Sequence, residues 1–151
     1  MLQSITIFLH RWPRLTSTNY QKTSEATEEY NCAAFAAYDE ENEWWPAGDY
    51  YWAFSKTDIP ELENFLRYFQ SKKYIVCKSE SYEKGFEKVA IYTSSSCEVL
   101  HLARQDSLCP KLGWWQSKMG SLEDIAHEKL ADLEGEFYGK VKYILKRRAL
   151  R

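Results

Sequence analysis

No stretch of this 151-residue sequence approaches the roughly 18 to 20 apolar residues that a membrane-spanning helix needs. The opening run, residues 2–10, is partly apolar, but it lacks a positively charged start and a small-residue cleavage site. We therefore do not interpret it as a secretory signal, and we expect a cytoplasmic protein that does not enter the membrane. A signal-independent export route would leave the same sequence.

Metal-binding and disulfide patterns are also missing. The four cysteines are Cys32, Cys77, Cys97 and Cys109, and no two of them form a Cys-x-x-Cys pair. Their spacing fits neither a zinc site nor the disulfide framework of a small secreted domain. We expect reduced thiols, no metal ion and no organic cofactor.

An excess of one charge is absent as well, because the net charge is −2. Such a chain has no overall field that would attract nucleic acid, so nucleic-acid binding is the least favoured function. The exception is a C-terminal run of basic residues with no acid between them: Lys140, Lys142, Lys146, Arg147, Arg148 and Arg151. This run fits either a solvated edge strand with a basic tail or a phosphate-binding patch.

The composition predicts one globular domain, since 44% of the residues are hydrophobic and 16% are aromatic. There are no internal repeats and no low-complexity linkers. We divide the chain into an N-terminal extension (residues 1–14), a single domain (15–148) and a basic C-terminal tail (149–151).

Three helices are predicted from capping residues and apolar stripes. Asn31 is a favourable N-cap for a helix that begins at Cys32 and runs through an alanine-rich segment. Asp58 and Pro60 suit the start of a second helix that extends to about residue 69. Ser121, with an acid three residues later, predicts a third helix with a capping box.

Short β-branched and aromatic runs predict strands at residues 74–77, 114–118 and 138–145. Residues 88–93 and 97–104 predict a hairpin joined through three serines. Because two N-terminal helices precede a mainly antiparallel sheet that one further helix interrupts, the predicted fold class is α+β.

Cys32 is the strongest candidate for chemistry. A cysteine in the first turn of a helix faces unpaired backbone N–H groups, which favour the reactive thiolate. His101, in the middle of a predicted strand, is the best-placed general base of the three histidines. Gln105 and Ser117, with Asp39 as a further alternative, are candidates to orient the imidazole.

Several residues are candidates to bind a substrate. Trp44, Trp45 and Trp115 could wall a cleft, or could equally form the lid of the core. Arg104 and Lys118 could hold a carboxylate or phosphate, although surface ion pairs are the simpler interpretation. Asn31 is a further candidate to bind the substrate.

The ordered segments 30–36, 44–46, 88–92, 101–105, 117–120, 124–127 and 134–139 resemble a widespread bacterial family of uncharacterised domains. The resemblance covers roughly residues 15–148. More distantly, the layout resembles NlpC-type cell-wall peptidases and papain-like amidases, which implies Cys32 as nucleophile. Lys88 stands where that resemblance implies the catalytic histidine, and His101 matches the residue that orients it.

These observations lead to two functional expectations. The first is a cysteine-dependent hydrolase or transferase acting on an amide or acyl bond, with Cys32 as nucleophile and His101 as base. The alternative is a catalytically inert, papain-like module that binds a protein or peptide partner.

Overall fold

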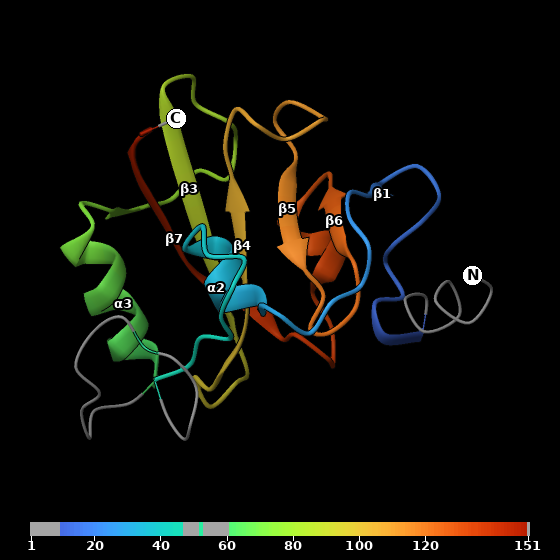
Figure 1. Cartoon of the computed structure of the whole chain (residues 1–151), viewed down its shortest axis with the longest axis horizontal. Helices are drawn as coiled ribbons and strands as arrows, with labels where there is room; N and C mark the ends of the chain where they lie inside the picture. The colour runs from blue at the N-terminus through green and yellow to red at the C-terminus, as the bar shows by residue number, and fades with distance from the viewer. Residues whose placement is uncertain (1–9, 47–51, 53–60, 151) are drawn as a thin grey trace.

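A seven-stranded sheet forms the centre of the protein (Figure 1). The computed structural model describes residues 10–46, 52 and 61–150. All strand pairs are antiparallel, in the order β1-β6-β5-β4-β3-β7-β2. The strands are β1 (Tyr20–Lys22), β2 (Ile75–Cys77), β3 (Phe86–Thr93), β4 (Val99–Gln105), β5 (Trp115–Lys118), β6 (Asp124–His127) and β7 (Lys140–Arg148).

Helical structure is sparse in the described part of the chain. Besides the helical residues 10 and 11, it consists of α2 (Cys32–Ala36), α3 (Glu61–Ser71) and a 3-10 turn, η1 (Leu130–Leu133). The protein is therefore mainly β, and the predicted α+β class with a papain-like arrangement of N-terminal helices is wrong. The main physical reason is that α2 is only five residues long and that the predicted third helix is a strand.

The segment after Ser121 forms β6 because its side chains are buried on both faces of the sheet. Ile125 packs in the core, and β6 pairs with β5 on one side and β1 on the other. Asp124, predicted to cap a helix, instead accepts a 2.7 Å hydrogen bond from the Tyr30 hydroxyl. Tertiary pairing thus overrides the local capping pattern.

Other local predictions are confirmed. The β3–β4 hairpin turns through the serine segment, and strands occur near the other three predicted positions. Asn31 caps α2, since its side-chain oxygen accepts a 3.0 Å hydrogen bond from Ala34 N–H. The predicted capping residues of the second helix, Asp58 and Pro60, lie outside the described residues.

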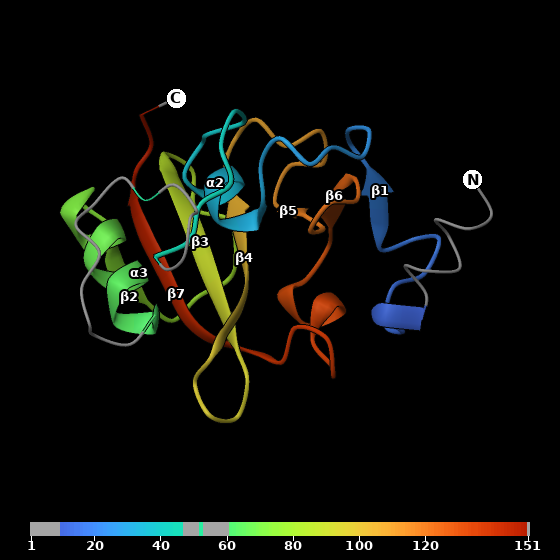
Figure 2. The ribbon, with the colours of Figure 1, turned by 60° about the horizontal axis from the view of Figure 1, so that its bottom comes forward.

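The sheet has a core on each face, because successive side chains of a strand point to opposite sides. On the first, which we call the helix face, α2 and α3 cover Val89, Ile91 and Leu102. Figures 1 and 2 show α2 lying across β4 on this side. We call the second face the arm face. It is covered by the N-terminal segment, η1 and the loop before β7, which contribute Trp12, Leu15, Leu130, Leu133 and Tyr138. Beneath them lie the sheet residues Ala90, Tyr92, Ala103, Trp115 and Ile125.

Trp12, which precedes Leu15 in the described part of the chain, contributes to the arm face. Trp12 is almost completely buried, and its ring lies 5.1 Å from that of Tyr138. Within the described residues, no helix has the length and apolar character required to cross a membrane.

Candidate functional site

Cys32 is the first residue of α2 and is only 8% exposed, on the helix face. Burial is the largest influence on its thiol and raises the pKa to about 11, because a thiolate is poorly solvated there. Hydrogen bonds from the backbone of Leu102 and Ala33 oppose this rise without cancelling it. The thiol is therefore protonated at neutral pH, contrary to the effect expected from the helix start alone.

His101 lies on the arm face, across the sheet from Cys32. It pairs with Tyr92 of β3, and its ring stacks on Tyr138 with a centroid distance of 4.0 Å. The neighbouring Leu102 is the β4 residue that packs on the helix face beside Cys32. The structure consequently does not bring Cys32 and His101 together, and the predicted nucleophile–base pair is not formed.

The imidazole of His101 is also poorly suited to proton transfer. Its side chain is fully buried, and neither ring nitrogen has a hydrogen-bond partner among the described residues. Burial, assisted by nearby His127, lowers its pKa well below the usual value. His101 is neutral and closed off from solvent.

Ser117 contacts a different histidine from the one predicted. Its Oγ lies 2.7 Å from Nε2 of His127, whose Nδ1 is 3.1 Å from the Lys129 carbonyl oxygen. A proton on Nδ1 satisfies both contacts, with the serine hydroxyl donating to Nε2. Both side chains are completely buried, and burial lowers the pKa of His127 to about 4. This pair stabilises the arm face and has no access to solvent.

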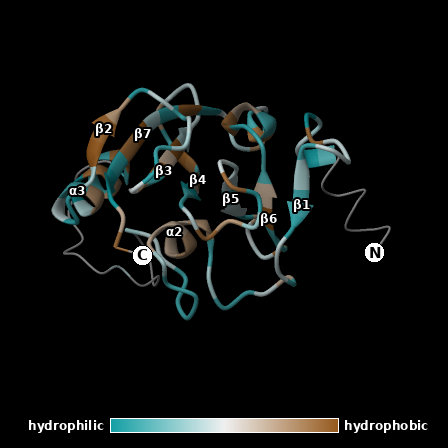
Figure 3. Cartoon of the chain, turned by 90° about the horizontal axis from the view of Figure 1, so that it is seen from above, coloured by the Kyte–Doolittle hydropathy of each residue, from teal (hydrophilic) through white to brown (hydrophobic). Residues whose placement is uncertain are grey.

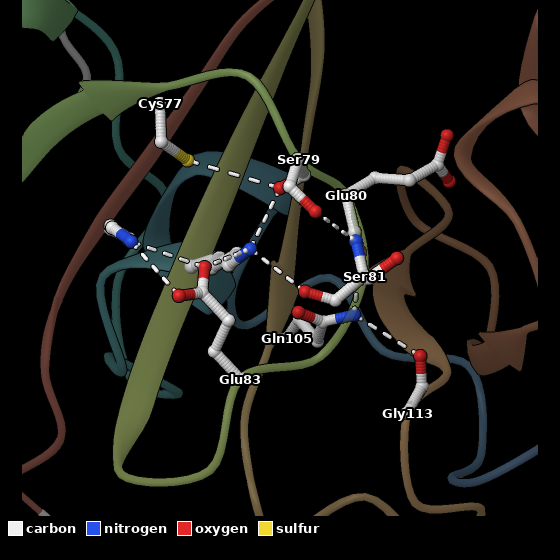
Figure 4. A network of polar contacts seen from close by, with 9 residues as sticks. Cys77, Ser79, Glu80, Ser81, Glu83, Gln105 and Gly113 are labelled. Carbon is white, nitrogen blue, oxygen red and sulfur yellow. Dashed lines mark hydrogen bonds and ion pairs between the residues drawn. The ribbon is translucent and has the colours of Figure 1, made fainter.

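Gln105 and Lys88 hold a loop in place instead of orienting a base (Figure 4). Gln105 Nε2 donates to the carbonyl oxygens of Glu80 and Gly113. Lys88 Nζ donates to the Ser79 and Ser81 carbonyl oxygens and forms a 2.7 Å ion pair with Glu83. Lys88 therefore neither replaces a catalytic histidine nor lies near Cys32, since its side chain is on the arm face with Gln105.

Most candidate substrate-binding residues have structural contacts. Asn31 exchanges hydrogen bonds with the backbone of Trp44, both as donor and as acceptor. Trp44 is buried in the core of the helix face, and Trp115 in that of the arm face. Lys118 Nζ donates to three backbone carbonyl oxygens, which satisfies the ammonium group.

A cavity of about 310 Å³ is lined by Asn31, Glu43, Trp45, Gly120 and Ser121.

Arg104 is the predicted binding residue that reaches a larger cavity. It lines an open cleft of about 570 Å³ together with Tyr38, Asp39, Glu40, Glu41 and Asn42, which we call the acidic cleft. The Arg104 guanidinium lies 3.7 Å from the Phe35 ring centroid and 4.4 Å from that of Tyr38. It also donates a 2.6 Å hydrogen bond to the Phe35 carbonyl oxygen.

A buried network fixes the wall of the acidic cleft. The Tyr38 hydroxyl is 2.7 Å from a carboxylate oxygen of Asp106 and 3.1 Å from one of Glu87. Arg104 and Arg147 form ion pairs with Asp106 and Glu87, respectively. Burial is the main reason that the pKa of Tyr38 is raised well above its usual value, so its hydroxyl keeps the proton. The positive charges of the two arginines thus neutralise the negative charges of the two carboxylates beneath the cleft.

The rim of the cleft is left negative. Asp39 accepts hydrogen bonds from Asn42 and from the indole of Trp44. Burial opposes ionisation, but these bonds together lower its pKa, so it is charged at neutral pH. Glu40 and Glu41 are exposed and form no ion pair with another described residue. Figure 3 shows the polar loop that follows the hydrophobic helix α2.

Sequence reasoning missed this cleft. The acidic run after α2 is visible in the sequence, but Tyr38, Glu87 and Asp106 are far apart along the chain. Tyr38 adopts a left-handed backbone conformation, with φ of 65°. Glycine usually occupies this conformation at a helix end, so the residues around Tyr38 do not predict it. Among the described residues, no group of three or more His, Cys, Asp or Glu side chains is arranged to hold a metal ion.

Comparison with known proteins gives a family. No curated protein and no solved structure matches the chain. The family model described as "Domain of unknown function (DUF7689)" matches residues 21–146, which is most of the sequence. The chain belongs to this family of domains of unknown function.

Proposed function

We propose that this domain is a non-catalytic binding module whose acidic cleft takes a basic segment of a partner protein. The observation that carries the proposal is the unbalanced charge of the cleft. Arg104 is neutralised by Asp106, whereas Asp39, Glu40 and Glu41 leave three negative charges at the rim. Lysine or arginine side chains are the protein groups that complement such a rim.

The cleft is also preorganised. The Tyr38 hydroxyl is hydrogen bonded to two buried carboxylates. The Arg104 guanidinium stacks on the rings of Phe35 and Tyr38 and donates a hydrogen bond to the Phe35 carbonyl oxygen. Groups that do not need to reorganise lose little conformational entropy when a ligand binds. A volume of about 570 Å³ is within the range of ordinary ligand sites and accommodates part of an extended peptide.

The hydrolase alternative has less support. A cysteine nucleophile needs a base within hydrogen-bond reach, and both buried histidines lie on the opposite face from Cys32. The third histidine, His10, is exposed in the N-terminal segment. The raised pKa of Cys32 also disfavours a hydrolase, because it keeps the thiol protonated at neutral pH.

Fluorescence anisotropy with labelled peptides tests the proposal. We expect an eight-residue peptide alternating lysine and glycine to bind the whole chain, and a glutamate–glycine peptide of equal length not to bind. The E40Q/E41Q variant should weaken binding by roughly tenfold, because each rim charge adds a modest surface interaction. Binding should also weaken as salt is raised.

A matched control is E98Q/E128Q, which removes the same charge from exposed positions outside the cleft. This variant should bind within twofold of the wild type. Equal losses in the two variants would mean non-specific attraction, and no binding of the lysine peptide at low salt would reject the proposal.

A further inference from the structure

A second cavity lies at the other end of the central strands. It measures about 600 Å³ and opens between the β3–β4 turn and the segment that leads into β7. Glu87, beneath the acidic cleft, and Thr93, in the wall of this cavity, are near opposite ends of β3. At about 3.4 Å per residue they are roughly 20 Å apart, so the two sites are separate. Figure 2 shows the hairpin turn at the end of the sheet remote from α2.

The backbone around this cavity is irregular. The register of β3 slips against β7 between Ile91 and Tyr92, so Lys142 has no residue opposite it. It also slips against β4 at the next position, which leaves Leu100 unpaired. β-Bulges redirect side chains and are common beside functional sites. Here one bulge lies at Lys142, which lines the cavity.

A close glycine contact closes the cavity wall. The backbone N–H of Gly135 donates a hydrogen bond to the Gly139 carbonyl oxygen, and the N–H of Gly139 donates one to the Gly135 carbonyl oxygen. These two hydrogen bonds hold the ends of the intervening loop together. Gly139 has φ of 72°, and a Cβ there would lie 2.0 Å from the Thr93 carbonyl oxygen. Only glycine allows the loop to pack this closely against β3.

Two lysines in the cavity are not neutralised. Further along β7, Lys146 and Arg147 pair with Glu83 and Glu87. Lys140 and Lys142 are exposed, line the cavity and form no ion pair with a described residue.

The acids in the cavity cancel only part of this charge. Glu134 is already engaged by Arg14 and by the backbone N–H of Val141. Counting Arg14 and both lysines against Glu134 and Glu136, the cavity keeps one positive charge in excess.

We propose that this cavity binds the phosphate group of a small phosphate monoester. Lys140 and Lys142 supply two positive charges, and the cavity is also lined by Thr93, Ser94 and Ser95, three residues that carry hydroxyl groups. A phosphate monoester carries close to two negative charges and three acceptor oxygens, which suits this set better than a carboxylate does. The cavity is much larger than a phosphate ion, so the organic part of the ligand also enters it.

Titration of the whole chain followed by amide NMR tests this proposal. Phenyl phosphate, benzoate and phenol serve as probes of equal ring size, with inorganic phosphate as a fourth. We expect phenyl phosphate to shift the amide signals of Ser95, Gly135 and Gly139, phenol to shift none, and benzoate to bind at least several-fold more weakly. Inorganic phosphate should shift the same signals with lower affinity.

The K140Q/K142Q variant should bind phenyl phosphate at least tenfold more weakly while keeping the wild-type melting temperature, because both side chains are exposed. K78Q/K84Q is the matched control, since these lysines are exposed and lie outside the cavity. The proposal is overturned if phenyl phosphate shifts no signal at the cavity, or if both variants lose affinity equally.

Discussion

The reactivity of a cysteine depends on the water around its sulfur as much as on the backbone that precedes it. Cys32 has the helix start that favours a thiolate, yet its sulfur is buried against Leu102. Desolvation outweighs the favourable N–H groups of a helix that is only five residues long. At the residue scale, Cys32 is therefore a core residue.

Alkylation kinetics provide the test at this scale. We expect iodoacetamide at pH 7 to label the exposed Cys97 first and to label Cys32 only when the protein unfolds, because its pKa is about 11 and its sulfur is buried. Mass spectrometry of the digested protein over time measures each site. In denaturant the four cysteines should react at similar rates, and native labelling of Cys32 ahead of Cys97 would contradict the prediction.

His101 shows why the predicted pair failed. Alternation along a strand correctly separates its side chain from that of Leu102, but alternation does not tell which side α2 covers. That choice depends on how the strand pairs and on which face the helix packs. The sequence thus predicted both residues as notable without predicting that a sheet separates them.

At the scale of elements, α2 and the following loop depend on one amide. Asn31 accepts from Ala34 N–H and Trp44 N–H, and donates to the Trp44 carbonyl oxygen. It thereby joins the start of the helix to the loop that carries the rim of the acidic cleft. The binding role first assigned to Asn31 becomes a positioning role in this structure.

Asn31→Ala should lower the free energy of unfolding by about 2 to 3 kcal/mol, since it removes the cap and leaves buried backbone groups unsatisfied. Asn31→Asp keeps both acceptor contacts but sets a carboxylate oxygen opposite the Trp44 carbonyl oxygen, so it should still cost at least about 1 kcal/mol. Urea unfolding of both variants measures the difference. A loss below about 0.5 kcal/mol for Asn31→Ala would show that the cap contributes little.

β6 illustrates the limits of local pattern at this scale. Ser121 and Asp124 fit a capping box, but residues 124–127 are buried on both sides and pair with two strands. A short, fully buried segment shows neither helical nor alternating periodicity. The hairpin β3–β4 was predictable because its turn residues and its strands are adjacent in the chain.

For the molecule as a whole, the arm face carries two buried neutral histidines. Burial lowers the pKa of His127 to about 4 and that of His101 well below 6.5. The unfolded chain binds protons at both sites near pH 6.5, whereas the folded chain does not. The contribution of these two histidines to the free energy of unfolding is therefore fully present above pH 6.5. It decreases as the pH falls from 6.5 toward the pKa values of the histidines in the folded protein.

Urea unfolding at pH 7.5 and pH 5.0 tests this dependence. The wild type should lose on the order of 2 to 4 kcal/mol between these values, because each site contributes up to about 1.4 kcal/mol per pH unit. His101→Phe keeps a stacked ring on Tyr138 and should remove about half of the loss. An unchanged pH dependence in this variant would show that His101 is not titrated on unfolding.

The sequence by itself determined the features that depend on neighbours along the chain: the capped start of α2, the β3–β4 hairpin and the positions of most strands. Turn residues, caps and short apolar runs act over a few residues, so they are legible locally. The tertiary structure alone decided that β6 is a strand, that Cys32 and His101 are on opposite faces, and that Tyr38, Glu87 and Asp106 meet beneath a cleft. These outcomes depend on strand register and on burial, and both are set by contacts between residues far apart in the sequence.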